Sequence, residues 1–468
     1  MKDYWQNYID GKFVDGGAGV IQVDNPGTGE KLADQAIADN ADVDKAVSAA
    51  KKVHESGFLT NMRPVERARM VKKIGAYLIE NLEEIAPLLS MEAGKTLFEA
   101  KFEVTNAARY FEYYGNQAET LEGRSIPLGS AYYDFTSYEP YGVSAQVIPW
   151  NFPLMMAAWK IAPALATGNT VVLKPAETTS LTAIKLAEII QEADLPAGVV
   201  NIITGAGATG AGIVNHPDID KIAFTGSTGV GKIIMKAIAG TNKKSTMELG
   251  GKAANIIFED APLDQAVEGV INGIYFNQGH VCCAGSRLFV QESVYELVLR
   301  KLKDRIQSLI LGDPLDKNTD IGAINSKEQL ATINKYLKIG QKEGAEMFQL
   351  DCSIPKKGFW CAPTLFTNVS QSHVIAKEEI FGPVLAIQTF RTIDEVITKA
   401  NNTPFGLSAG VWTDKGSKIF NLTSQMRAGV VWANTYNKFD PTSPFGGYKE
   451  SGHGREGGLH GLTPYLNF

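Results

Sequence analysis

Residues 142–173 read GVSAQVIPWNFPLMMAAWKIAPALATGNTVVL and set a pattern that recurs along the chain. A short apolar run at each end of this stretch, residues 142–148 and 170–173, predicts a buried strand. Further short runs alternate with helical or glycine-rich segments, at residues 199–203, 221–224 and 254–258. Strands that alternate with helices in this way predict a doubly wound parallel sheet, and therefore an α/β fold.

A second series of strands and helices begins near Gly285. Its predicted strands cover residues 288–290, 384–389 and 429–433, and its predicted helices cover residues 294–309 and 393–400. We therefore expect a second α/β domain with its own parallel sheet.

The N-terminal third has helical spacing, with one apolar face over residues 43–53 and another over residues 74–85. Between residues 125 and 143 the pattern changes to aromatic and β-branched side chains around a turn at residues 128–130. This change predicts a β-hairpin, and such a ribbon must pack against something.

The composition narrows the class of protein. Lys and Arg number 45 against 51 Asp and Glu, a net charge of −6, which argues against a nucleic-acid or anionic-membrane binder. The uncharged run at residues 140–159 has membrane length, but two prolines and Asn151 in its middle favour a buried strand and a functional loop. Four cysteines, two of them adjacent, and no leader-like N-terminus predict a cytoplasmic protein without a disulfide framework.

Three candidate ligand loops follow predicted strands. Residues 205–210 match G-x-G-x-x-G, yet no acid lies between Asp220 and Glu248, so the usual dinucleotide fingerprint fails. Residues 226–231 open a helix whose free N–H groups can hold a phosphate. Residues 174–177 contain a cation, Lys174, and an acid, Glu177, which could both reach ribose hydroxyls. Glycine turns are mostly only turns, but three such loops at successive strand ends favour a ligand site.

Reactive side chains are few. Cys282 lies in the glycine-flanked segment NQGHVCCAG (residues 277–285) and is either a nucleophile or an inert cysteine. Glu248 is either a general base or a charge at the end of a strand. His280 could pair with Cys282 in a hydrolase, which is a minor alternative. The six histidines lack metal-ligand spacing and no C-x-x-C occurs, so we expect no metal.

Seven ordered motifs together make the chain resemble the aldehyde dehydrogenase superfamily over nearly its whole length. They are PWNFP (149–153), KPAE (174–177), FTGST (224–228), ELGGK (248–252), GHVC (279–282), EEIFGP (378–383) and PFGGYK (444–449). The resemblance implies NAD-dependent oxidation of an aldehyde to the acid. Glu248 implies the hydrolytic type, because members that acylate coenzyme A generally lack this glutamate.

The same resemblance implies the site residues. Cys282, rather than Cys283, is the nucleophile, Asn151 the oxyanion donor and Glu248 the base that activates water to hydrolyse the thioester. The implied cofactor residues are Ile148, Trp150, Lys174, Glu177, Gly207, Gly226, Ser227, Glu379 and Phe381. A carboxylate at Glu177 would repel a 2′-phosphate and favours NAD, although the adjacent Lys174 leaves NADP open. The implied substrate residues are Phe152, Met156, Trp159, Phe276 and Phe445, an apolar tunnel that suits medium aliphatic or aromatic aldehydes.

By family analogy, residues 1–122 and 142–250 bind NAD and residues 251–449 form the catalytic domain. Residues 123–141 are the protruding hairpin that pairs subunits, which predicts a homodimer. Residues 450–468 are the C-terminal segment. The family normally continues past the part matching residues 462–468 into a final strand that helps form the oligomerisation sheet, so we leave a tetramer open. His280 also stands where the family usually has glutamine. Rival functions are a non-catalytic binding relative, a thiol esterase and a semialdehyde-specific dehydrogenase.

Overall fold

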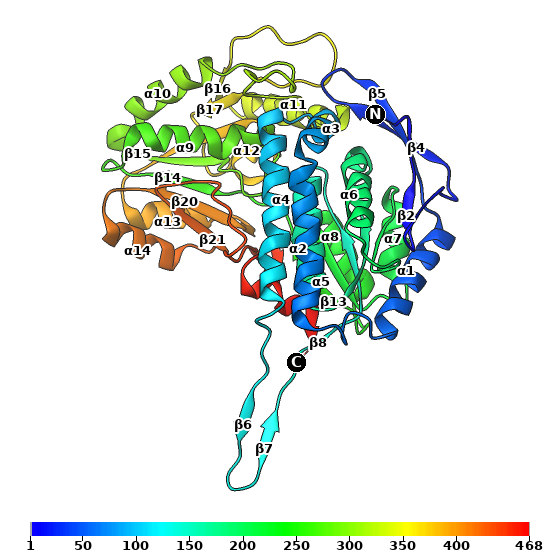
Figure 1. The fold of residues 1–468 in the computed structure, drawn as a ribbon. Helices are drawn as coiled ribbons and strands as arrows, with labels where there is room; N and C mark the ends of the chain where they lie inside the picture. The colour runs from blue at the N-terminus through cyan, green and yellow to red at the C-terminus, as the bar shows by residue number, and fades with distance from the viewer. Residues whose placement is uncertain (1, 468) are drawn as a thin grey trace.

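The computed structural model describes residues 2–467, which contain two large sheets lying side by side (Figure 1). The first sheet has, in spatial order, β23 (Gly452–His453), β13 (Lys244–Glu248), β12 (Lys221–Thr225), β9 (Val143–Val147), β10 (Thr170–Lys174), β11 (Val200–Ile202), β2 (Asn7–Ile9) and β3 (Lys12–Val14). The five strands from β13 to β11 are parallel. Because the chain leaves β9 toward β10 and later returns to its other side at β12, the sheet is doubly wound.

The second sheet repeats this design with seven strands. Its order is β16 (Glu346–Gln349), β17 (Thr364–Thr367), β18 (Val384–Phe390), β15 (Arg287–Gln291), β14 (Ala254–Ile257), β20 (Ser408–Trp412) and β21 (Val430–Ala433). All neighbours are parallel except β16, which runs antiparallel to β17. The predicted α/β fold with two doubly wound parallel sheets is confirmed. The assignment of residues 254–258 to the first sheet is wrong, because β14 pairs with β15 and β20 in the second.

Helices cover both faces of the first sheet, which explains why its central strands are buried on both sides. One face carries α1 (Asn40–Glu55), α7 (Gly207–Asn215) and α8 (Thr228–Ile238), and the other carries α5 (Pro153–Ala166) and α6 (Leu181–Glu192). Every residue of α5, β10 and β12 is buried. The uncharged run at residues 140–159 is thus a buried strand, a loop and the start of a core helix, and no helix of residues 2–467 is long and apolar enough to cross a membrane.

The N-terminal third is only partly helical. Residues 4–36 form short strands instead: β1 (Tyr4–Trp5), β2, β3, β4 (Val20–Asn25) and β5 (Glu30–Ala36). The predicted apolar face over residues 74–85 is shared by α2 (Pro64–Glu80) and α3 (Leu82–Ala93), which meet at Asn81. The long helix α4 (Leu97–Gln117) then packs against α2 and α5.

The remaining elements surround the second sheet or close the chain. They are α9 (Leu263–Tyr275), η2 (Phe276–Gly279), α10 (Tyr295–Gln307), α11 (Lys327–Lys342), α12 (Val374–Lys377), α13 (Ile393–Asn401), α14 (Gly416–Gln425), β19 (Phe405–Gly406) and β22 (Tyr448–Lys449). At its end the chain returns to the first half, where β23 pairs with β13 and β24 (Leu466–Asn467) pairs with β8 (Glu139–Pro140).

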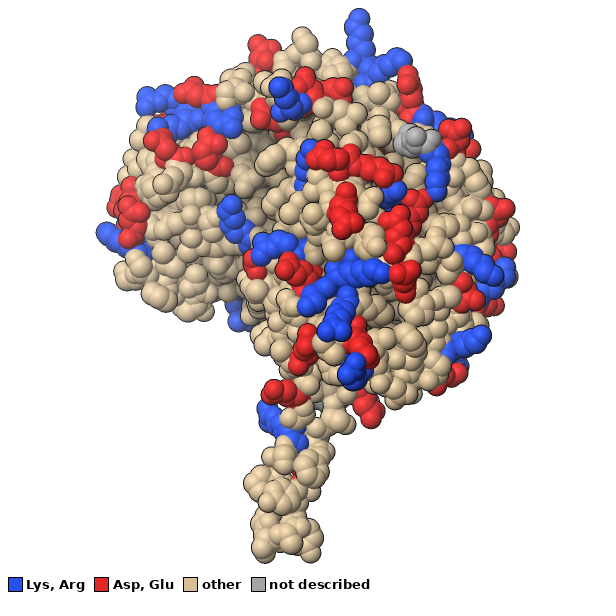
Figure 2. Space-filling model, in the orientation of Figure 1, with Lys and Arg blue, Asp and Glu red and all other residues tan. Residues whose placement is uncertain are grey.

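The predicted hairpin is confirmed as β6 (Ser125–Pro127) and β7 (Tyr133–Phe135), and it projects far from the rest of the molecule (Figure 1). Most of its projecting surface carries no charge (Figure 2). Its large exposed apolar side chains are Ile126, Leu128, Tyr132, Tyr133 and Phe135.

Candidate active site

A cavity of about 550 Å³ lies at the carboxyl ends of four parallel strands of the first sheet. The last residues of β9, β10, β12 and β13 all reach its wall, namely Val147, Lys174, Thr225 and Glu248. This is the end of an open α/β sheet at which ligands gather. The cavity is also lined by Cys282 and Asn151 and by all nine predicted cofactor residues, so the fold brings these candidates together.

Cys282 comes from the second half of the chain, in the loop that leads into β15. Two residues of the preceding η2, Asn277 and Gln278, have left-handed φ values of 50° and 54°, so this turn is held in an unusual backbone conformation. A hydrogen bond with Cys283 and burial raise the pKa of the Cys282 thiol well above its usual range. The thiol is therefore protonated at neutral pH and needs a base to become a nucleophile.

Glu248 is buried, and neither carboxylate oxygen has a hydrogen-bond partner among residues 2–467. Burial raises its pKa well above the usual range, and the neighbouring Glu456 raises it further. The ammonium group of Lys160, which is paired with Glu456, opposes this shift. A carboxyl group with a raised pKa and free oxygens is suited to accept a proton from a thiol or a water molecule.

Asn151 lies in the loop between β9 and α5 and is also buried. Its Nδ2 donates to the His280 carbonyl at 2.9 Å, which ties this loop to the cysteine loop. An amide nitrogen carries two hydrogens, so the second one is available to an oxygen atom in the cavity.

The pair Gly250–Gly251 lets three segments meet. The Gly251 amide donates to Glu379 Oε1 at 3.0 Å, and a Cβ on Gly250 would lie 2.2 Å from Glu379 Oε2. A Cβ on Gly251 would lie 2.4 Å from the Cys282 carbonyl oxygen. At Gly251 the obstacle is backbone, so only glycine fits there, whereas a side chain at Gly250 would displace the Glu379 carboxylate.

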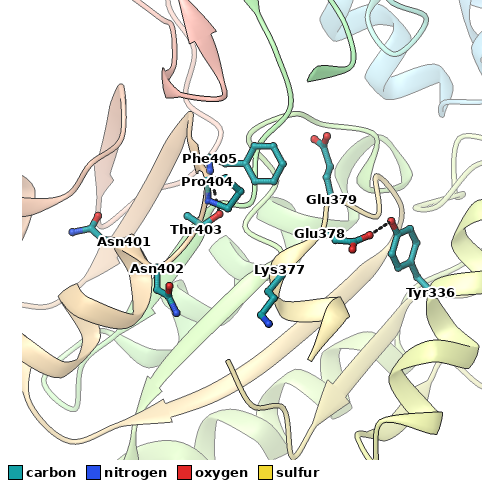
Figure 3. Close-up of a pocket in the computed structure, with 9 residues that line it drawn as sticks. All are labelled: Tyr336, Lys377, Glu378, Glu379, Asn401, Asn402, Thr403, Pro404 and Phe405. Atoms are coloured by element: carbon teal, nitrogen blue, oxygen red, sulfur yellow. Dashed lines mark hydrogen bonds between the residues drawn. The ribbon is translucent and has the colours of Figure 1, made fainter. Parts of the chain in front are cut away.

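Glu379 also borders a second, outer hollow of about 650 Å³ (Figure 3). There the neighbouring Glu378 accepts a hydrogen bond from the Tyr336 hydroxyl at 2.7 Å, while the Glu379 carboxylate points away from that pair. Burial raises the pKa of Glu379 to about 7. The two adjacent acids therefore lie in different environments, and only Glu379 lines the cavity that contains Cys282.

The family model described as "Aldehyde dehydrogenase family" matches residues 13–468. The chain belongs to the aldehyde dehydrogenase family. Human "Retinal dehydrogenase 2" is 46% identical over an alignment of 469 residues, and the match covers 99% of this chain and 89% of that protein. The family membership expected from the sequence motifs is therefore confirmed.

Two solved aldehyde dehydrogenases share the whole fold. A Bacillus cereus aldehyde dehydrogenase in complex with NAD+ has a TM-score of 0.97 at 42% identity, and the match covers 99% of this chain and 95% of that one. A mutant P. syringae indole-3-acetaldehyde dehydrogenase, in complex with NAD+ and IAA, has a TM-score of 0.98 at 38% identity, with coverage of 100% and 96%.

In this aldehyde dehydrogenase, His280 does not form the pair with Cys282 that the hydrolase alternative requires. Its ring packs edge-on against Trp150, with centroids 4.8 Å apart, and stacks on Phe381 at 5.9 Å. Burial lowers the pKa of His280 to about 3, so the ring is neutral at physiological pH. His280 thus fills space between two residues of the cavity wall and supplies no charge to the thiol.

The predicted substrate residues divide into two groups. Phe152 and Met156 line the cavity, whereas Trp159, Phe276 and Phe445 do not. Those three lie in a layer of aromatic rings behind it: Phe276 stacks on Phe152 at 6.3 Å, and Trp159 packs edge-on against Phe445 at 5.5 Å.

The sequence argument missed several wall residues. Gln329, from α11, lines the cavity and donates to the carbonyls of Ile380 and Phe381. An apolar slot between α7 and α8 was also missed, and its members are Ala211, Val214, Val230, Ile233 and Ala237. The sequence signal that could have indicated this slot is the presence of apolar residues, Val230 and Ile233, outside the helical face of α8 that is buried in the core.

Proposed function

We propose that this protein oxidises an apolar aldehyde to the carboxylic acid with NAD, through a thioester on Cys282. The observation that carries the proposal is the meeting of a thiol, an unpartnered buried carboxyl group and a carboxamide on one cavity at the end of a doubly wound sheet. This combination provides a nucleophile, a base and an oxyanion donor, which acyl chemistry requires.

The residues at the carboxyl end of the first sheet are suited to bind NAD. The glycine turn before α8 and its capping residue Ser227 leave helix N–H groups free for phosphate. Lys174 and Glu177 lie at the end of β10, where they can reach ribose hydroxyls, and the apolar slot between α7 and α8 suits a flat ring. When bound there, NAD supplies the acceptor for the hydride that leaves the substrate carbon.

In the first half of the reaction, Cys282 gives its proton to Glu248, which passes it to solvent, and the sulfur attacks the aldehyde carbon. The carbonyl oxygen becomes an alkoxide, which Asn151 Nδ2 and the Cys282 amide stabilise, a contribution of about 3 kcal/mol in comparable sites. Loss of hydride from the same carbon then leaves an acyl group on Cys282 as a thioester.

In the second half, Glu248 removes a proton from water, and the oxygen attacks the thioester carbon. The carbon–sulfur bond breaks, the acid leaves, and Cys282 returns as a thiolate that can take back the proton. The burial of Glu248 suits this role, because a carboxyl group with a raised pKa is the stronger base.

We expect kcat/KM to rise with pH above neutrality. Both Cys282 and Glu248 have raised pKa values and both must be deprotonated to act, so activity is lost as pH falls. The measurement is a pH profile of kcat/KM for the wild type and Glu248→Gln. A profile that is flat from pH 6 to 9 in the wild type would exclude these two groups as the titrating pair.

Cofactor preference is expected to depend on Glu177. Its carboxylate would repel a 2′-phosphate, so Glu177→Gln should improve kcat/KM for NADP relative to NAD by about tenfold, since the group is partly exposed and screened. Glu192→Gln, at the exposed end of α6, is the matched control. An unchanged NADP to NAD ratio in Glu177→Gln would remove this carboxylate from cofactor choice.

The aldehyde is proposed to be apolar and medium-sized or aromatic. Phe152 and Met156 face the cavity, and no arginine among residues 2–467 lines it, which disfavours a carboxylated semialdehyde. The names of two relatives, a retinal dehydrogenase and an indole-3-acetaldehyde dehydrogenase, agree with an apolar substrate.

The proposed function is tested by following NADH absorbance with purified protein and a panel of acetaldehyde, hexanal, benzaldehyde and succinic semialdehyde. NAD reduction with hexanal or benzaldehyde is the expected result. A preference for succinic semialdehyde would overturn the substrate class. If no aldehyde of the panel yields NADH while NAD binding is intact, the result would favour a non-catalytic relative.

We also propose that the β6–β7 hairpin pairs subunits of a homodimer. Its two strands have unpaired edges and its apolar side chains are exposed, a combination that monomers rarely tolerate. Replacing Leu128 and Phe135 together by serine should therefore yield monomers in sedimentation velocity, where the wild type is at least dimeric. Unchanged sedimentation of the variant would place the contact elsewhere.

A further inference from the structure

We propose that Lys95 is a positioning residue, which fixes the backbone at Asn151 so that its side-chain amide is held ready for the alkoxide. The inference rests on the proposed function, because it presupposes the role given there to Asn151. Lys95 itself does not line the cavity, so it acts only through Asn151.

The Lys95 side chain is completely buried, in the connection between α3 and α4. Its Nζ donates to the backbone carbonyl of Asn151 at 2.7 Å and to Glu103 Oε2 at 2.5 Å. The same ammonium group lies 4.2 Å from the centre of the Phe152 ring. A buried lysine is rare unless it is paired, and here one of its three donors is directed to the backbone of a proposed catalytic residue.

Glu103 extends this contact to the start of α5. Its Oε1 accepts the backbone amides of Leu154 at 2.9 Å and Met155 at 3.1 Å, which are the first free amides of the helix. The N-cap residue of α5, Phe152, provides no side-chain cap. A carboxylate from α4 therefore caps α5 in its place, and Lys95 neutralises that carboxylate.

The Asn151 carbonyl accepts a second hydrogen bond, from the side chain of Asn277. Asn277 Nδ2 donates to it at 2.9 Å, and the Asn277 amide in turn donates to Glu99 Oε1 at 2.5 Å. Glu99 and Glu103 are four residues apart and so lie on one face of α4. This face therefore holds both the Asn151 loop and the left-handed turn that precedes Cys282.

The two hydrogen bonds to the Asn151 carbonyl restrict the position of the Asn151 side chain. Rotation of the peptide after Asn151 would break the bonds from both Lys95 and Asn277, so the carbonyl direction is fixed, and with it the origin of the side chain. A misplacement of about 1 Å in a catalytic group commonly costs about a hundredfold in rate.

The test compares E103Q with K95M/E103Q in the full-length protein. Glu103→Gln keeps an acceptor for the α5 amides and the bond from Lys95 to Asn151, but it leaves the buried Lys95 ammonium group without its partner charge, so the thermal stability of each variant is measured alongside its rate. The double variant removes the bond to Asn151 together with that charge. We expect the single-turnover rate of NADH formation to fall by about a hundredfold from E103Q to K95M/E103Q, with KM and NAD affinity unchanged. K95Q/E103Q, which retains a donor at this position, should lose less.

The same comparison in an N151A background separates positioning from general damage. If Lys95 acts through Asn151, adding K95M/E103Q to N151A should not lower the rate further. If its effect is merely structural, the fold-losses in rate of K95M/E103Q and N151A should multiply. The surface pair Lys101–Glu83 supplies the control K101M, which should keep the wild-type rate.

Three results would overturn the proposal: equal rates for E103Q and K95M/E103Q, a multiplied loss in the N151A background, or K95Q/E103Q as slow as K95M/E103Q. Full activity of N151A alone would instead remove the proposed role of Asn151. That outcome is a failure of the proposed function and is distinguishable from the other three.

Discussion

Cys282→Ala is expected to lower aldehyde oxidation by roughly 10⁴-fold or more while cofactor binding stays intact. Without the sulfur there is no covalent intermediate, so neither the alkoxide nor the thioester can form. NAD affinity should not change, because the Cys282 side chain is not among the proposed cofactor contacts, which come mostly from the strand ends and helix starts of the first sheet. Steady-state NADH formation measures the first effect, and quenching of tryptophan fluorescence by NAD measures the second.

Cys283→Ala is the matched control for this experiment. Cys283 is fully buried, and its Sγ lies 3.7 Å from Asn437 Oδ1 as a weak donor, so its side chain belongs to the core of the second half. The control should retain most of the activity, with a modest loss from the hydrogen bond between the two cysteines. The opposite pattern, an active Cys282→Ala and an inactive Cys283→Ala, would transfer the nucleophile to Cys283.

Glu248→Gln is expected to separate the two halves of the reaction. Acylation should still release one NADH per active site, but turnover should then fall by about 10²-fold to 10³-fold, because no base remains to activate water. Stopped-flow absorbance should show a burst followed by a slow steady state. The burst itself should also slow if Glu248 takes the thiol proton.

Glu450→Gln is a suitable control, since Glu450 is an exposed partner of Lys232. It should show wild-type kinetics without an enhanced burst. A steady-state rate in Glu248→Gln equal to the wild type would contradict the assignment of the hydrolytic base.

The parts of the fold that were predictable are those buried on both faces. β9, β10 and β12 are almost fully buried and carry short apolar stretches, because helices cover the sheet on each side. β13 reads KSTME and begins at the exposed edge of the sheet, so its sequence carries no such signal. The N-terminal strands were missed for a similar reason: β4 and β5 are mostly half-buried or exposed, and their pattern is weak.

The site residues that belong to motifs at strand ends were predictable from the sequence. The residues whose burial depends on tertiary packing were not. Residues from four strand ends meet because parallel strands share one carboxyl edge. Lys95 and Glu103, in contrast, read as ordinary charges on or beside a helix, and such charges are usually solvated. Only the packing of α4 on α5 buries them, which no local pattern reveals.

The return of β23 to the edge beside β13 has a consequence for how the protein is made. Glu248 leaves the ribosome about 200 residues before its neighbour Gly452, which at common rates of synthesis is a delay of roughly 10 to 40 s. During that interval β13, which carries the proposed base Glu248, has no partner on its outer side and is open to mispairing. Nascent chains should therefore be most dependent on chaperones after the first sheet has emerged and before the last strands have closed it.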